Sequence, residues 1–173
     1  PLIAASRDND PEIQIRATDG LVNFYVPGYV KTGLTASLKR AGTRISARFT
    51  DTNDQAIDPF VQVRPEVVDA LGKLARGGVG LEVRANAARA AGVLRGRAAV
   101  PDLLAALKTK DSQVLYECLV AFQKIRDPQS ARGFQYLVRD LDEKVQLAAI
   151  EGQGLLLNRN ALPDLVDVLH RPR

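Results

Sequence analysis

The amino-acid sequence predicts an all-α fold, a right-handed solenoid built from antiparallel helical hairpins. Three observations predict it. Residue patterns recur at an interval of 31 positions, as at Val83, Val114 and Val145. A proline opens one helix of the repeated unit, and an aspartate precedes the other. The 173 residues are 46% hydrophobic and 25% charged, a composition that suits one folded array with a real core.

The first helix of each unit is predicted from a proline in its first turn, where the missing N–H costs nothing. Val100–Leu104 (VPDLL) recurs two periods later as Leu162–Val166 (LPDLV), and Arg64–Val68 (RPEVV) is a third copy. Residues 132–134 hold the intermediate position. Apolar residues such as Leu103 and Leu107 fall on one helical face.

The second helix follows an aspartate that can cap it, at Asp10, Asp111 and Asp142. Its apolar residues recur at spacings of three and four, and small or apolar residues repeat at Ala87, Cys118 and Ala149. We expect the two helices of a unit to pack through Leu104, Leu107, Leu119, Phe122 and Ile125. The glycines Gly92, Gly152 and Gly154 lie inside second helices, and at Gly92 we expect a close approach between stacked units.

A single hairpin cannot bury its apolar stripe alone, so the units are expected to stack into one array covering residues 1–173. The predicted units are 1–26, 27–63 (degenerate or inserted), 64–97, 98–127, 128–158 and the half unit 159–173.

The motifs Asp10–Ala17, Glu82–Ala88 and Ala99–Leu107 resemble short bacterial HEAT repeats of the type grouped with phycobilisome-lyase HEAT-like repeats. The resemblance covers residues 1–26 and 64–170. It implies an armadillo/HEAT-like superhelix whose second helices line a concave surface. It says little about activity, because the motif residues are core and capping residues.

The segment between the first and third units is irregular, most clearly around 43–63. Val30–Ala41 has helical spacing and predicts a helix after Pro27-Gly28. Residues 44–49 and 60–64 alternate partly as strands do, with a polar loop between them. Either a small β-hairpin or an ordered irregular loop fits this pattern, and the loop is favoured.

The polar loop raises the question of calcium, because Asp51, Asn53, Asp54 and Asp58 offer oxygen ligands. An EF-hand requires Gly at its sixth position and Glu at its twelfth, where this chain has Ala56 and Gln62. Such Asx residues form turns far more often than metal sites. The sequence therefore predicts no metal site.

The net charge is +4, and the basic residues are unevenly distributed. Residues 20–50 and 83–101 hold no acidic residue. A basic face of this kind could follow a phosphate backbone, so nucleic-acid binding is an alternative function. The small net charge and the absence of Trp argue against a HEAT-like DNA glycosylase. The basic residues of the two segments are Lys31, Lys39, Arg40, Arg44 and Arg48, then Arg84, Arg89, Arg95 and Arg97.

Catalysis has little support in the sequence. The one histidine, His170, excludes sites that need two imidazoles, and the one cysteine, Cys118, excludes an internal disulfide. The repeat register places Cys118 among buried small residues. We expect that the protein is not an enzyme and binds no cofactor; a lyase-like HEAT protein is a further alternative.

The sequence has neither an apolar run long enough for a membrane span nor a recognisable targeting segment. Its start without Met suggests a processed or cut terminus.

The predicted function is non-catalytic binding of a protein or peptide on the concave surface. Mixed charged and apolar residues suit a protein partner better than a polyanion. Three rows of second-helix positions are predicted to point outward: Arg16, Asn86, Glu117 and Ala148; Asp19, Arg89, Val120 and Glu151; Asn23, Val93, Lys124 and Leu155.

The ends suggest a fragment of a longer repeat protein. Pro1–Ser6 is short for a first helix, and Leu162–His170 is a first helix with no second helix after it. We expect Leu165, Val166 and Leu169 to leave part of their apolar stripe in solvent, which favours weak self-association through the ends.

Overall fold

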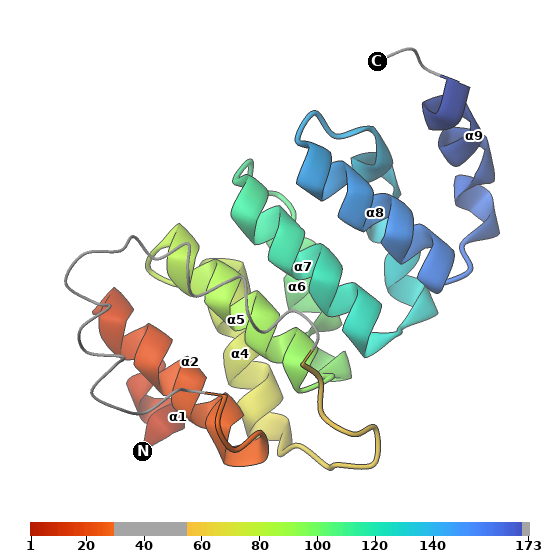
Figure 1. Cartoon of the computed structure of the whole chain (residues 1–173). Coiled ribbons are helices and arrows are strands. Elements are labelled where there is room, and N and C mark those ends of the chain that lie inside the picture. The colour runs from red at the N-terminus through yellow and green to blue at the C-terminus, as the bar shows by residue number, and fades with distance from the viewer. Residues whose placement is uncertain (30–54, 171–173) are drawn as a thin grey trace.

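The computed structural model describes residues 1–29 and 55–170 of the chain, and throughout these ranges the regular structure is helical, without a strand. The predicted all-α class is thus confirmed for the described residues. Helices alternate between two layers along the chain (Figure 1). One layer contains α2 (Pro11–Tyr25), α5 (Leu81–Val93), α7 (Ser112–Ile125) and α8 (Glu143–Leu155). The other contains α1 (Leu2–Ala5), α4 (Pro65–Gly77), α6 (Val100–Ala106), the 3-10 helix η3 (Pro128–Arg139) and α9 (Leu162–His170).

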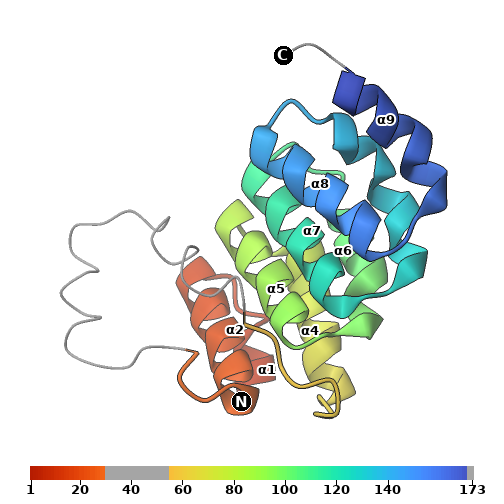
Figure 2. The same ribbon diagram turned by 45° about the vertical axis from the view of Figure 1, so that its right-hand side comes forward.

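The order of packing follows the order of the chain. In the first layer α5 packs against α2 and α7, and α7 packs against α8. In the second layer α4 packs against α1 and α6, and η3 packs against α6 and α9. Figures 1 and 2 show the result, two neighbouring rows of helices with α1 and α2 at one end and α8 and α9 at the other.

Equivalent residues of successive units begin and end the second helices. The carboxylates of Asp10, Asp111 and Asp142 accept hydrogen bonds from backbone N–H groups in the first turns of α2, α7 and α8, as predicted. At the other end Arg95, Arg126 and Leu157, each 31 residues apart, have φ of 49°, 59° and 54°. A left-handed residue of this kind ends a helix by turning the chain, so α5, α7 and α8 stop within one residue of the same place in the period. The short 3-10 turns η2 (Arg97–Ala99) and η4 (Arg159–Ala161) then lead into α6 and α9.

The core is continuous across the units. Phe122 of α7 stacks on Phe134 of η3, with ring centroids 5.2 Å apart and planes 6° from parallel. Both rings are fully buried, as are Cys118 and Leu119. The predicted core positions are confirmed: Leu107 and Ile125 are buried, and Leu104 is partly buried against the same cluster.

Neighbouring second helices approach closely at Gly92. A Cβ atom built on Gly92 of α5 would lie 2.7 Å from the Cα of Ala121 in α7, a distance that real Cβ atoms do not show. The expected close approach is therefore confirmed at this glycine. Gly154, 62 residues later in α8, has open space where its Cβ would lie.

The described part of the insertion, residues 55–64, is irregular. The favoured prediction of an irregular loop is confirmed for these residues, and the alternative strand at 60–64 does not form. The described residues contain no strand that could pair with 60–64. Phe60 is 92% exposed, and Val63 packs against the core. Ile57 is buried instead, and its N–H donates to the carbonyl of Val93 at 2.9 Å. The expected helix at 30–41, the strand at 44–49 and Asp51, Asn53 and Asp54 lie outside the described residues.

Truncating the buried ring of Phe122 should be costly. We expect Phe122→Ala to lower the free energy of unfolding by about 3–5 kcal/mol, because it leaves a cavity against Phe134. Urea denaturation measures the change. The matched control is Phe24→Ala, at a ring that is 79% exposed, which should change stability by less than about 0.5 kcal/mol. A loss below about 1 kcal/mol for Phe122→Ala would contradict this packing.

The two glycines offer a second test. Gly92→Ala should destabilise by about 1–3 kcal/mol, because its methyl group meets the backbone of α7. Gly154→Ala should stabilise by up to about 1 kcal/mol, because alanine favours the helix and nothing opposes the methyl group. Thermal and urea unfolding of the two variants should therefore shift in opposite directions. A Gly92→Ala variant as stable as wild type, or more stable, would show that the approach at Gly92 is not tight.

Candidate functional site

The predicted outward rows lie on second helices, but half of their twelve members are buried. The structure buries Ala148 and five of the eleven predicted partner-binding residues, Asn86, Arg89, Val93, Glu117 and Val120. The prediction that these positions face outward was wrong. Adjacent second helices approach so closely that positions assigned to one open face lie largely between helices.

The buried rows form cross-helix pairs with a fixed register. The amide Nδ2 of Asn86 in α5 donates to Oδ1 of Asp19 in α2 at 3.0 Å. One helix further, Nε of Arg89 in α5 lies 3.9 Å from Oε2 of Glu117 in α7. In each pair a residue of the Asp19 row meets the residue of the Arg16 row on the following helix. The next positions in this register, Val120 and Ala148, are both apolar and buried.

Glu117 is the most perturbed acid of the cluster. Burial raises the pKa of its carboxyl group from 4.5 to about 7, against the opposing effects of Arg89, Lys124 and a hydrogen bond from Gln113. That bond runs from Nε2 of Gln113 to Oε1 of Glu117 at 2.9 Å. The pair between Arg89 and Glu117 is therefore a packed structural contact within the interface of α5 and α7.

The remaining row residues are accessible to different degrees. Arg16 is exposed and forms an ion pair with Glu12 at 2.8 Å, and Glu151 and Leu155 are exposed on α8. Asp19, Asn23 and Lys124 are partly buried. Oδ1 of Asn23 accepts a hydrogen bond from the N–H of Gly28 at 3.1 Å, so its side chain holds the chain after α2.

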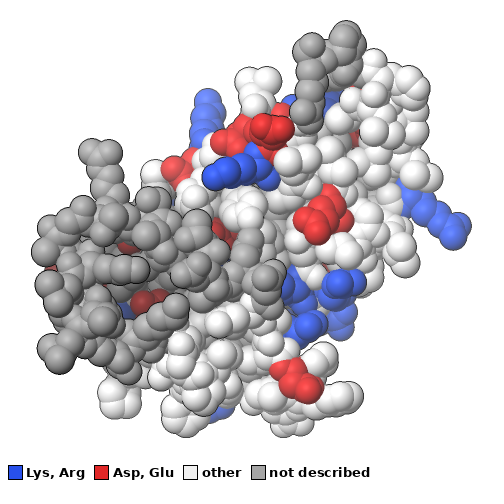
Figure 3. All heavy atoms as spheres, in the orientation of Figure 1, with Lys and Arg blue, Asp and Glu red and all other residues white. Residues whose placement is uncertain are grey.

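A largely apolar surface covers the end of the molecule that carries α8 and α9. We call it the terminal face and define it by Leu147, Glu151 and Gly154 of α8 with Leu162, Val166 and Leu169 of α9. The leucines and the valine are between 51% and 82% exposed. As expected, the α9 stripe is partly in solvent, and Leu165 is the member that packs inward. In Figure 3 this end of the described surface is mainly white, so few charged side chains lie on the face shown.

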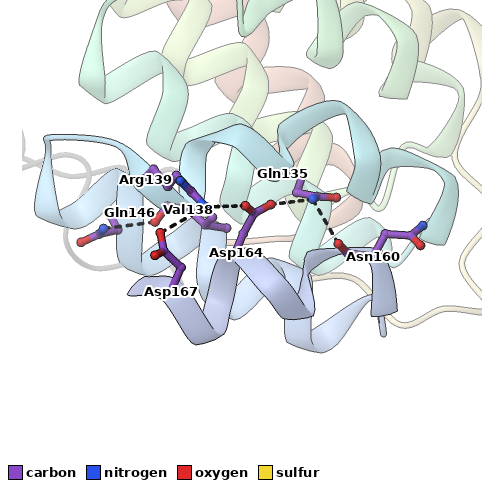
Figure 4. A network of polar contacts seen from close by, with 7 residues as sticks. All are labelled: Gln135, Val138, Arg139, Gln146, Asn160, Asp164 and Asp167. Atoms are coloured by element: carbon purple, nitrogen blue, oxygen red, sulfur yellow. Dashed lines mark hydrogen bonds and ion pairs between the residues drawn. The ribbon is translucent and has the colours of Figure 1, made fainter. Parts of the chain in front are cut away.

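Polar contacts hold α9 in place, as Figure 4 shows. Asp164 accepts a hydrogen bond from Nε2 of Gln135 at 2.7 Å and pairs with Arg139 at 2.7 Å. These two partners, Gln135 first, lower the pKa of the Asp164 carboxyl group against the effect of desolvation. Arg139 also reaches Asp167 at 3.2 Å. Because Asp164 and Asp167 point toward η3, the residues at 162, 166 and 169 face away from it.

A cleft lies where the 57–65 segment crosses the start of α4 and the end of α5. It is an open cleft of about 270 Å³. Arg95 anchors it, donating from Nε to the carbonyl of Ile57 at 3.0 Å and from Nη1 to the carbonyl of Lys124 at 3.1 Å. The lining residues are Ile57, Asp58, Pro59, Val61, Val63, Pro65, Val68, Leu94, Arg95, Gly96, Arg97 and Ala98.

The basic residues at 83–101 are mostly engaged within the protein. Arg89 is buried beside Glu117, Arg95 holds two carbonyls, and Nε of Arg84 donates to the carbonyl of Ala75 at 3.3 Å. Arg97 is exposed but lies 3.8 Å from Asp127. Arg84 and Arg95 therefore use their guanidinium N–H groups to hold backbone carbonyls, while Arg89 and Arg97 lie beside acidic side chains. Lys31, Lys39, Arg40, Arg44 and Arg48 lie outside the described residues.

Reactive and metal-binding groups give no further site in the described ranges. Burial raises the pKa of the Cys118 thiol to about 12, which disfavours the nucleophilic thiolate. Oδ1 of Asp58 accepts the N–H of Phe60 at 2.9 Å, an Asx turn. No group of three or more acidic, His or Cys side chains gathers around a possible metal position within 1–29 and 55–170. None of the helices described is both long and apolar enough to cross a membrane.

The sequence did not predict the cross-helix pairs or the cleft at Arg95. The register held a signal for the pairs, since opposite charges at Arg89 and Glu117 stand on adjacent rows of consecutive units. The cleft depends on the path of the 57–65 segment, which has no repeat pattern.

Comparisons with known proteins assign no family to this chain. No family model matches the sequence, and no curated protein is significantly similar to it.

The buried carboxyl group of Glu117 should make stability depend on pH. Because its pKa is raised in the folded state, the unfolded chain loses this proton near pH 4.5 and the folded chain near pH 7, so stability falls as pH rises between these values. Glu117→Gln keeps an acceptor for Gln113 and removes the titration. Relative to wild type, the variant should gain up to about 3 kcal/mol between pH 5 and pH 8.

Urea denaturation of both proteins at each pH gives this difference, and other titrating groups cancel in it. A difference that stays constant from pH 5 to pH 8 would show that Glu117 is ionised throughout.

Proposed function

We propose that the chain is a HEAT-like right-handed α-solenoid that acts as a non-catalytic scaffold for binding a protein or peptide. The order of packing supports the solenoid, because each hairpin contacts the hairpins before and after it in the chain. The 31-residue spacing of the caps and of the left-handed turns supports equivalent units. The resemblance to short bacterial HEAT repeats agrees with both.

The terminal face carries the proposed binding function. Exposed apolar patches of this kind mark interaction sites in soluble proteins. The face combines apolar side chains with one acidic residue, Glu151, which is an exposed member of the predicted rows. We therefore place the binding surface on α8 and α9 rather than along the whole set of rows.

Nucleic-acid binding and lyase-like catalysis have less support. Three of the four arginines in the basic segment 83–101 hold groups of the protein itself, and acidic and basic side chains are interspersed on the described surface (Figure 3). Glu117 and Cys118, whose pKa values are strongly raised, do not line the cleft at Arg95.

A selection experiment tests the scaffold and its location. Peptides from a displayed random library are selected on the chain, and their affinities are measured for Val166→Asp and for Phe60→Asp as a control. Both positions are exposed, at 51% and 92%. We expect selected peptides to lose about tenfold or more in affinity for Val166→Asp, because a charge introduced on the terminal face must be desolvated, and to bind Phe60→Asp as wild type.

Anisotropy with random-sequence duplex DNA at increasing salt tests the alternative. A Kd tighter than about 1 µM at physiological salt, falling steeply as salt rises, would favour a phosphate-binding protein and contradict the scaffold. Selected peptides that bind Val166→Asp as well as wild type would place the binding surface elsewhere.

A further inference from the structure

The walls of the cleft at Arg95 are fixed by hydrogen bonds of the protein itself. Ile57 is buried, its N–H donates to the carbonyl of Val93, and its own carbonyl accepts from Nε of Arg95 at 3.0 Å. Nη1 of Arg95 donates to the carbonyl of Lys124 in α7. One guanidinium group therefore ties the 57–65 segment to the ends of α5 and α7. Figures 1 and 2 show this segment beside the end of α5 and away from α8 and α9.

The strand-like alternation of residues 60–64 has a counterpart in the cleft. Val61 and Val63 line it, whereas Gln62 between them does not. Alternate residues of an extended chain point to opposite sides, so the apolar side of this stretch faces the cleft. Arg64 has φ of −59° and ψ of 132°, the extended conformation that a following proline favours.

The main chain of this stretch offers unused hydrogen-bonding groups. The N–H groups of Gln62 and Val63 and the carbonyls of residues 61–63 have no hydrogen-bond partner among the residues that the structure describes. The N–H of Val61 donates to the carbonyl of Asp58 at 3.0 Å. An exposed chain with free N–H and carbonyl groups can pair with a second extended chain, as in binding by β-augmentation.

The lining of the cleft carries more positive than negative charge. It contains Arg95, Arg97 and one acidic residue, Asp58. The side chain of Arg97 is 69% exposed, and Asp127 lies 3.8 Å from its Nε, too far for a hydrogen bond. Oδ1 of Asp58 accepts the N–H of Phe60, and within the described ranges Asp58 forms no ion pair with either arginine. Arg97 therefore has free donors, and a guanidinium group can bind a carboxylate through two parallel hydrogen bonds.

The volume of the cleft limits the size of a ligand. A cavity of about 150 Å³ holds one benzene-sized group. The cleft, at about 270 Å³, is therefore large enough for one apolar side chain and the backbone beside it. It is smaller than the pockets of about 300–1,000 Å³ that enclose whole small-molecule ligands or cofactors.

We propose that the cleft binds an extended segment of a partner protein, in which an apolar side chain enters the cleft and a carboxylate two residues away meets Arg97. The spacing follows from the extended chain, in which residues i and i+2 point to the same side. The backbone of this segment pairs with Gln62 and Val63. The site is separate from the terminal face, so it adds a second binding surface to the proposed scaffold.

Three synthetic peptides of matched length test the chemistry of this segment. In GTETLTETG a glutamate stands two residues from the leucine on each side, so either chain direction presents a carboxylate to Arg97. GTTELETTG has the same composition, but its glutamates are next to the leucine and point to the opposite side of an extended chain. GTQTLTQTG keeps the spacing and lacks the carboxylates.

NMR titration of the isotopically labelled 173-residue chain measures binding and locates it. The variants are Arg97→Glu and Val61→Asp, both at exposed residues of the lining. The matched control is Arg159→Glu. Arg159 begins η4 as Arg97 begins η2, is equally classed as exposed, and lies outside the cleft. A second control, Val166→Asp, alters the terminal face, and circular dichroism checks the folding of each variant.

We expect GTETLTETG to cause saturable shifts at the amides of Gln62, Val63 and Gly96, with a Kd below about 1 mM. Arg97→Glu should weaken binding about tenfold, because it places like charges together, and it should bind the lysine peptide GTKTLTKTG better than the wild-type chain does. Val61→Asp, GTTELETTG and GTQTLTQTG should each weaken binding by a similar factor. Arg159→Glu and Val166→Asp should leave it unchanged.

Several results would overturn the inference. They are the absence of saturable shifts, equal binding of GTETLTETG and GTTELETTG, and an effect of Arg159→Glu as large as that of Arg97→Glu. Binding of N-acetylleucine as tight as that of GTETLTETG would assign the cleft to a small carboxylate, and dimers of the chain that Arg97→Glu abolishes would assign it to a second copy.

The proposed function is tested separately. If library peptides require Val166 while GTETLTETG does not bind, the scaffold and its terminal face stand and the second site is wrong.

Discussion

The close contact between consecutive second helices is the constraint on which the remaining structure depends. A hairpin of two short helices has an apolar stripe whose exposure to water is unfavourable, and only a neighbouring hairpin can cover it. Gly92 permits the backbones of α5 and α7 to approach, and the stacked rings of Phe122 and Phe134 then fill the space between the layers. Because each unit is buried by its neighbours, stability is shared along the row of helices.

The polar pairs between consecutive second helices, Asp19 with Asn86 and Arg89 with Glu117, fix how the helices align along their axes. Removing one partner of a buried pair leaves a desolvated group without compensation, so a helix that slid by one turn would place Arg89 or Glu117 against apolar neighbours. The pairs also explain why charged residues occupy rows that amphipathic patterning assigns to the surface. In some proteins a buried ion pair favours one arrangement over others more than it adds to stability, and we propose this role for Arg89 and Glu117.

Helix α9 presents its apolar residues to solvent and its polar residues to the protein. At α9 the polar residues turn inward, to Gln135 and Arg139, and the apolar residues turn outward. This inverts the usual arrangement of a surface helix, whose apolar face packs on the core. In the equivalent helix α6 the same pattern is satisfied on both sides, since Asp102 pairs with Arg76 at 3.0 Å and Leu107 is buried. The exposed stripe of α9 thus has the composition of an interior position.

The sequence by itself determined the helical hairpins, their caps, the core around Phe122 and the close approach at Gly92, because these depend on local spacing and on a period that repeats in the chain. It also indicated the partly exposed stripe of α9. Only the tertiary structure decided which face of each second helix meets solvent. The hydrophobic pattern fixes one side of a helix, whereas the burial of Asn86, Arg89, Glu117 and Val120 depends on the distance and crossing of neighbouring helices. The path of residues 55–64 and the cleft at Arg95 likewise follow from long-range contacts such as that between Arg95 and Ile57, for which the local sequence carries no periodic signal.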